Sequence, residues 1–334
     1  MTQTLSMSKL YQKLSAVGLK EVYVREFGLP SWWSDELNHK AAAVLEGAGY
    51  ISTRLNLDLA SLLKDDQEVR FKSLPRTKFK YHNQAQSDIP NISHQLASRI
   101  AELVAHGIEQ PYTPLPTNCN QMRREILQSH PKVNLKALLD YCWQHGIAVI
   151  YFNKYPQKAR KITAMIQWQS DRPVIVLSGT HLRPARLAFH LAHELAHLAL
   201  GHVEDGIRID DDINPSSTDS EEQEANQMAV ELLVEQLDNC FRGKSFFKAI
   251  QLEKAILGQL ESDSTVDACV LAYNYAWHAH HKNKQAYGQA EKAIQRLDSS
   301  RNGDVVINQF LEQHIDWDVL SDDSIDHLES ILGD

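Results

Sequence analysis

Most of the chain has the hydrophobic spacing of amphipathic helices, and the clearest case lies in residues 184–201. Leucines recur there every three or four positions, which places them on one buried stripe. These positions are Leu187, Leu191, Leu195 and Leu198. Pro184 suits the first helical turn and Gly201 suits the position just past the end. The pattern predicts a helix between these two residues.

Three short runs near the middle of the chain have the composition of strands instead. Residues 147–152, 162–168 and 174–177 are rich in β-branched and apolar side chains. Asn134 is suited to cap a helix that runs to His145 just before the first of them. We predict an α+β fold in which a small sheet packs on helices.

A second helix is predicted at residues 220–233, with Asp219 or Ser220 as its cap. Further helical stretches precede the strands, at about 1–63 and 93–106, and follow them, at about 246–260 and 266–281. Within the first, we expect an interruption near Gly47. Mostly helical regions therefore flank the α+β core.

Composition fits a cytoplasmic protein. The 334 residues are 43% hydrophobic, which allows two or three domains with real cores. The N-terminus lacks the apolar segment of a signal peptide, and no run of eighteen apolar residues indicates a membrane span.

The cysteines are far apart and form no Cys-x-x-Cys motif, so we interpret them as reduced, packed thiols. They are Cys119, Cys142, Cys240 and Cys269.

The net charge of −9 is concentrated in the tail. Beyond Arg301 there are nine acidic residues and no lysine or arginine, so the rest of the chain is close to neutral. This tail is either a solvated helical end whose apolar residues pack inward, or a surface that docks on a basic partner.

The predicted helix at 184–201 carries a His-Glu-x-x-His motif formed by His193, Glu194 and His197. The two histidines lie one turn apart, so both imidazoles can reach one metal ion. Glu194 is placed to accept a proton from a water that the metal activates.

The third metal ligand has to come from elsewhere, and Glu222 is the better of two candidates. His202 follows Gly201, and extending the helix would place it nearly opposite the histidine pair. Glu222 shares a helical face with the small residues Ala225 and Ala229, which allow close packing on the first helix. Two histidines and one glutamate leave a fourth metal position open.

Two further residues are candidates for supporting the ligands. Asn226 lies one turn after Glu222, where it can accept a hydrogen bond from a ligating imidazole. His190 precedes His193 by one turn and either supports the site or is simply packed.

These motifs resemble the ImmA/IrrE family of gluzincin metallopeptidases. The resemblance rests on His193-Glu-Leu-Ala-His197, on Glu222-x-x-Ala-Asn226-x-x-Ala229 and on the Leu-Leu pair ending at Leu233, and it extends over about residues 118–240. Here Val-Glu-Gln follows Leu233 in place of the Met-Pro that is frequent in the family, a departure that concerns local packing.

The resemblance implies a zincin-like core, a Zn²⁺ cofactor and an endopeptidase that cleaves helix-turn-helix regulators, with roles in transcription regulation and stress response. Many members pair the peptidase domain with a helix-turn-helix module. Residues 51–63 resemble the closing helices of such a module. We therefore predict four parts of the chain: 1–65 helix-turn-helix-like, 66–117 basic and aromatic linker with a helix, 118–243 peptidase, and 244–334 helical with the acidic tail.

The sequence leaves two pairs of alternatives open. Residues 69–81 mix basic and aromatic side chains, which either track a nucleic acid or form a linker packed on the neighbouring domain. The protein as a whole is either a zinc endopeptidase acting on a protein substrate, or a metal-stabilised regulator that binds DNA or protein and has a non-catalytic or partner-gated site. We expect the segment 202–219 to be a mobile flap beside the cleft.

Overall fold

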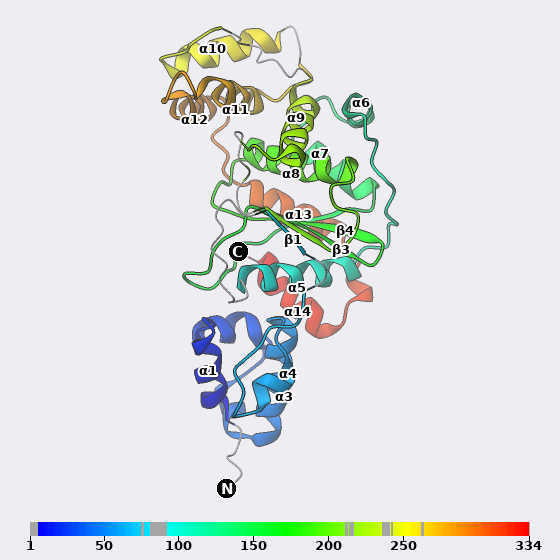
Figure 1. Ribbon diagram of the computed structural model, residues 1–334, viewed down its shortest axis with the longest axis vertical. Helices are drawn as coiled ribbons and strands as arrows, with labels where there is room; N and C mark the ends of the chain where they lie inside the picture. Colours follow the sequence, from blue (N-terminus) through cyan, green and yellow to red (C-terminus); the bar gives the residue numbers. More distant parts are fainter. Residues whose placement is uncertain are drawn as a thin grey trace.

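The computed structural model describes residues 6–74, 77–80, 92–210, 213, 217–235, 241, 243–261 and 264–333, and only the backbone of 77–80. The molecule is elongated, with the N-terminal helices at one end, a sheet in the middle and a group of three helices at the other end (Figure 1). Those three are α10 (Ala249–Leu260), α11 (Ala268–Ala279) and α12 (Ala286–Leu297). The fold class is α+β, as predicted.

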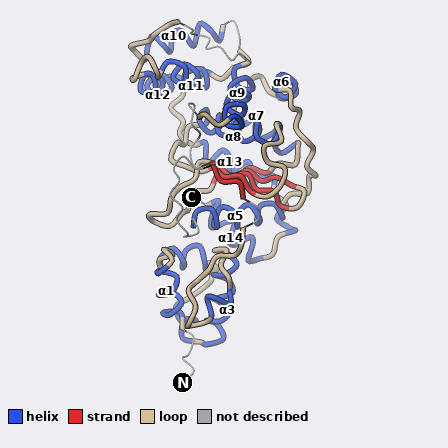
Figure 2. Tube along the Cα trace, viewed as in Figure 1, coloured by secondary structure: helices blue, strands red, loops and turns tan. Residues whose placement is uncertain are grey.

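The sheet has five strands among the described residues, in the order β1-β5-β3-β4-β2 (Figure 2). The strands are β1 (Thr77–Lys80), β2 (Ala148–Tyr151), β3 (Ala164–Gln169), β4 (Arg172–Leu177) and β5 (Ile207–Asp210). β3 is antiparallel to both of its neighbours, whereas β1 is parallel to β5 and β2 is parallel to β4. The three predicted strands are confirmed as β2, β3 and β4, and β1 and β5 are additions.

Alternating side chains bury the two faces of the sheet in two separate cores. On one face, Ile166 and Ile175 join the core formed with α7 (Leu135–Gln144) and α8 (Pro184–Ala199). On the other, Met165 and Val174 join the core that includes α5 (Ile92–His106). The sheet is therefore covered by helices on both sides, and α13 (Gly303–His314) also packs against β2.

The N-terminal end consists of short helical elements. These are α1 (Met7–Ala16), α2 (Glu21–Tyr23), η1 (Val24–Gly28), η2 (Asp35–His39), α3 (Ala41–Arg54) and α4 (Leu59–Leu63). The expected interruption near Gly47 was wrong, because α3 runs through it without a break. A Cβ atom at residue 47 would lie 2.6 Å from the ring of Trp33, so this glycine makes room for the indole.

The acidic tail folds back onto this N-terminal end. It forms α13, η3 (Trp317–Val319) and α14 (Asp322–Leu332), with Leu328 and Ile331 buried in the same core as α1 and α3. Asp323 and Asp326 accept hydrogen bonds from Arg54. Two acidic side chains of the tail are thus engaged within the molecule.

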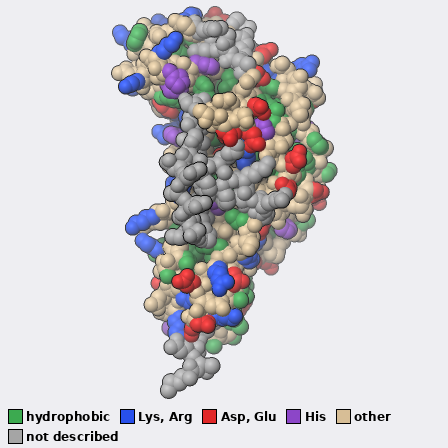
Figure 3. All heavy atoms as spheres, viewed as in Figure 1, with side chains coloured by type: hydrophobic (Ala, Val, Ile, Leu, Met, Phe, Trp, Pro, Cys, Tyr) green, Lys and Arg blue, Asp and Glu red, His purple; other side chains and the backbone are tan. Residues whose placement is uncertain are grey.

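Several expectations lie partly outside the described residues. In the basic and aromatic segment, Arg76, Tyr81 and the side chains of β1 are not described, and neither is Cys240. The other three cysteines are free and buried. On the face shown in Figure 3, basic and acidic side chains are interspersed over the N-terminal helices. In the part of the chain that the structure describes, no helix combines the length and apolar character needed to cross a membrane.

Candidate metal centre

The motif helix α8 begins and ends where the sequence predicts. Pro184 occupies its first turn, and the chain leaves the helix through Gly201, whose φ of 71° is left-handed. Its leucines pack in the core beside the sheet. His193, Glu194 and His197 have 0% exposure, so the motif faces the interior of the protein.

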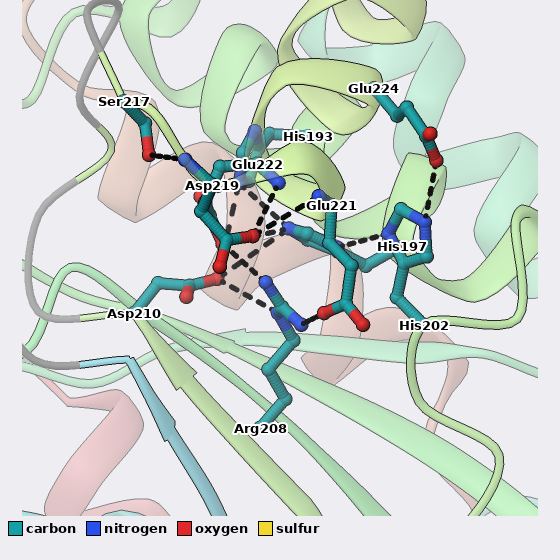
Figure 4. A network of polar contacts seen from close by, with 10 residues as sticks. All are labelled: His193, His197, His202, Arg208, Asp210, Ser217, Asp219, Glu221, Glu222 and Glu224. Atoms are coloured by element: carbon teal, nitrogen blue, oxygen red, sulfur yellow. Dashed lines mark hydrogen bonds and ion pairs between the residues drawn. The ribbon is translucent and has the colours of Figure 1, made fainter.

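Helix α9 (Ser220–Val234) brings Glu222 to the two histidines (Figure 4). Asp219 caps α9 by accepting hydrogen bonds from the backbone of Glu221 and Glu222. Ala225 and Ala229 are fully buried. Because these side chains are small, α9 packs closely on α8, as the sequence predicted.

The facing atoms of the three residues lie within a few ångströms of one another. His193 Nε2 is 3.0 Å from His197 Nε2. Glu222 Oε2 is 3.4 Å from His193 Nε2, and Glu222 Oε1 is 3.7 Å from His197 Nε2. Two nitrogens and a carboxylate therefore converge on one small volume.

Strand β5 adds two residues to the site that were not predicted. Ile207 and Ile209 point into the core on the α5 side of the sheet, so Arg208 and Asp210 point to the opposite face, toward the histidines. Asp210 Oδ2 lies 3.9 Å from the Nε2 atoms of both His193 and His197.

The expected flap at 202–219 was therefore wrong for this part of the segment. Residues 207–210 are a buried strand held between β3 and β1. The alternation Ile-Arg-Ile-Asp was a two-residue period that could have revealed the strand. Asp211, Asp212 and residues 214–216 of the same segment lie outside the described residues.

Arg208 holds the carboxylates of the site in place. Its side chain is fully buried, and it donates to Glu222 and, over 2.9 Å, to Glu221. Its Nε is 3.5 Å from Asp210 Oδ2. One guanidinium thus faces several carboxylates, which leaves the site with surplus negative charge.

Burial and the neighbouring charges shift the pKa values of the acidic groups. Burial, followed by the nearby Asp210 carboxylate, raises the pKa of Glu194 well above its usual range. Burial also raises the pKa of Asp210, although Arg208 opposes the shift. Burial acts in the same direction on Glu222, but its hydrogen bond with His193 and the charge of Arg208 outweigh it and lower the pKa.

A second ring nitrogen of His197 contacts His202, which corrects the predicted placement of His202. The Nδ1 atoms of the two rings are 2.8 Å apart, and His202 Nε2 is 3.2 Å from Glu224 Oε2. The left-handed turn at Gly201 brings the chain back over the last helical turn, where the His202 amide donates to the His197 carbonyl. An extended helix would have carried His202 away.

The two residues proposed to support the ligands occupy different positions. Asn226 is buried on α9, one turn after Glu222. His190 is 5% exposed and lines a pocket between α8, α9 and α11, and its Nδ1 has no hydrogen-bond partner. Their roles in the site stay predictions.

The donor set fits a bound cation. His193, His197, Asp210 and Glu222 each offer one ligand atom, and these atoms all lie within 4.8 Å of one another. Both carboxylate oxygens of the buried Glu194 and Oδ2 of Asp210 lack hydrogen-bond partners. Buried carboxylates without partners are unfavourable unless a positive charge compensates them, so the cluster is compatible with a metal ion.

A buried cluster of this kind on two packed helices beside a small sheet defines a metallopeptidase-type centre. Residues 142–236 match the family described as the IrrE N-terminal-like domain. Over these residues, which are less than a third of its length, the chain is similar to the ImmA/IrrE metallopeptidases, and the match supports a metallopeptidase-type function. No curated protein matches the chain. No solved structure matches it either.

Proposed function

We propose that the protein is a zinc-dependent endopeptidase in which His193, His197 and Glu222 hold the metal ion and Glu194 is the general base. The convergence of two imidazole nitrogens and one carboxylate, within 3.7 Å of one another along each contact, is the observation that supports it. This ligand set is typical of catalytic zinc sites that keep one position open.

Zn²⁺ in such a site acts as a Lewis acid and activates water at neutral pH. Glu194 accepts the proton of the attacking water and delivers it to the leaving amide nitrogen. Glu194 follows His193 directly on α8 and is fully buried, and neither of its carboxylate oxygens has a hydrogen-bond partner, so both oxygens are free to take the proton. Arg208 positions Glu222 by its hydrogen bond to the carboxylate.

The substitution Glu194→Gln tests this proposal. The amide keeps the size of the side chain but cannot accept the proton, so we expect zinc content to be preserved and cleavage to fall by roughly 10²–10⁴-fold. We propose a helix-turn-helix repressor as the substrate; the regulator encoded by a neighbouring gene is co-expressed with the protein, and fragments are detected by mass spectrometry. Glu46→Gln, an exposed glutamate on α3, is the matched control and should cleave normally. Fragments that persist in Glu194→Gln would contradict the proposal.

Two observations favour the alternative of a metal-stabilised regulator. Asp210 lies within 3.9 Å of both histidines, and four protein ligands are typical of closed structural zinc sites. His193, Glu194 and His197 are also fully buried, which fits a site that a partner has to open. The substitution Asp210→Asn distinguishes the regulator from the endopeptidase. If Asp210 is the fourth ligand of a structural site, the variant should lose zinc. If the protein is the proposed endopeptidase, the variant should keep zinc and its Glu194-dependent cleavage. Cleavage that appears only with the partner present supports the gated form.

A further inference from the structure

An apolar pocket adjoins the metal centre on the side of α11. Its walls come from α8, α9, α11 and α12, and include Phe189, Val230, Leu233 and Trp277. Phe189 links the pocket to the site, because its ring centroid is 6.5 Å from that of His193 and 5.1 Å from that of Trp277. The pocket therefore lies one helical turn away from the metal-site residue His193.

The pocket contains a buried amide that has no partner. Asn274 is 7% exposed, and both its Nδ2 and its Oδ1 lack hydrogen-bond partners. It lies one helical turn before Trp277, so both side chains reach the same side of α11. Buried amides without partners are unfavourable, and a site that contains one is completed by a ligand that offers both a donor and an acceptor. A peptide group has this pair.

The size and the charge of the pocket narrow the choice of ligand. The cavity volume is about 80 Å³, several times the roughly 10–15 Å³ that one water needs, which suits a single side chain. Arg186 also lines the pocket, with its guanidinium 5.9 Å from the ring of Tyr273. Its positive charge disfavours lysine and arginine, and the apolar walls favour an aliphatic side chain.

We propose that this pocket binds one aliphatic side chain of a peptide substrate, with Asn274 pairing with the adjacent main-chain amide. The inference rests on the proposed function and deepens it, because it makes an apolar residue near the scissile bond the preferred substrate class. Phe189 connects the pocket to the metal centre, because its ring lies near those of both Trp277 and His193.

Binding of a small probe tests the pocket without requiring cleavage. The full-length protein is labelled with 5-fluorotryptophan, and Trp277→Phe identifies the resonance of Trp277. N-acetyl-leucine methylamide should shift that resonance saturably, whereas N-acetyl-lysine methylamide should not. Asn274→Leu should weaken binding by about tenfold, since it removes the paired donor and acceptor.

The second variant fills the pocket with a larger side chain. Val230→Trp should abolish the shift, because the larger side chain occupies the cavity, and Val319→Trp, at a residue that is 53% exposed, is the matched control. The proposal is overturned if Trp277 does not respond to the leucine probe, if Val230→Trp binds as well as the wild type, or if N-acetyl-glutamate methylamide binds more tightly. Probe binding without Glu194-dependent cleavage would count against the endopeptidase alone, and cleavage without probe binding would count against the pocket alone.

Discussion

Two buried arginines, Arg54 and Arg208, lie in different parts of the molecule and belong to different kinds of ion cluster. The first cluster is a structural ion pair network, and the second is a candidate ligand site. Arg54, on α3, is 1% exposed and donates to Asp323, Asp326 and the carbonyl of Leu29. The backbone amide of Ser31 donates to Asp326 as well. None of these side chains has a buried atom without a partner.

Arg208 is an equally buried arginine, but it is surrounded by more carboxylates than its single positive charge can neutralise. It faces Asp210, Glu221 and Glu222, with the buried Glu194 close by. Oxygen atoms of Glu194 and Asp210 have no hydrogen-bond partner there. The comparison teaches that surplus carboxylate and orphaned atoms, more than burial, distinguish a candidate ligand site from a structural ion pair.

Substituting each arginine gives the largest expected difference. Arg54→Ala should destabilise the protein by about 3 kcal/mol, the lower end for a broken buried pair, because Asp323 and Asp326 are 29% and 21% exposed. Zinc should not reverse this loss. Arg208→Ala should also destabilise the zinc-free protein, but zinc should restore stability, since a cation replaces the lost positive charge. Urea unfolding with and without zinc measures both, and a zinc rescue of Arg54→Ala would break the comparison.

The two clusters also differ in how far the sequence could predict them. His193, Glu194, His197 and Glu222 follow from helical spacing. The helices that carry them also have clear start signals, a proline in the first turn of α8 and the Asp219 cap of α9. Arg208, Asp210 and His202 were missed because their positions depend on tertiary pairing. A four-residue strand gives only two periods of alternation, and the return of the chain at Gly201 is decided by one left-handed residue.

The Arg54 cluster could not be predicted at all from local pattern. Its partners lie more than 260 residues later in the chain, as the separation of Arg54 from Asp323 shows. The sequence indicated an acidic helical tail with an apolar face, which the structure confirms, but no periodicity specifies which arginine meets it. Sequence-based prediction was correct where the contacts are local. It failed where the position of a side chain depends on a single long-range pair.

Metal addition sharpens the comparison by acting on one cluster only. If the histidines and carboxylates beside Arg208 form a zinc site, zinc at a hundredfold excess over its Kd should stabilise the protein by about 2.7 kcal/mol. Thermal unfolding with zinc or with a chelator measures the shift. The double variant His193→Ala, His197→Ala should lose the shift, and a shift of equal size in that variant would place the zinc elsewhere.

Acid should weaken the Arg54 region through His327, a neighbour of this cluster. His327 is 3% exposed, and burial followed by the charges of Arg54 and Arg99 lowers its pKa to about 3. The folded pKa lies below the unfolded value of about 6.5, so the unfolded state binds more protons and stability is lost as pH falls from about 6.5 toward 3. At pH 5 the loss is about 2 kcal/mol.

Comparison with His327→Gln isolates this contribution. The amide does not titrate, so the difference in unfolding free energy between the wild type and the variant should shrink by about 2 kcal/mol between pH 7.5 and pH 5. Asp326 also contacts this region, but it stays charged in that window because hydrogen bonds from Ser31 and Arg54 outweigh burial and lower its pKa. If the difference in unfolding free energy between the wild type and the variant did not change with pH, protonation of His327 would not be coupled to unfolding.

The smallest expected effect concerns the outer contacts of the metal cluster. If His197 binds zinc through Nε2, its Nδ1 carries a proton and donates to His202, whose Nε2 then donates to Glu224. His202→Ala should weaken zinc binding by about tenfold, the lower end for such partners, because the Glu224 side chain is 61% exposed and water can replace it. Competition with a chromophoric chelator measures the affinity. His106→Ala, at an exposed histidine on α5, should leave it unchanged. Equal affinities of His202→Ala and the wild type would mean that His197 is oriented by α8 alone.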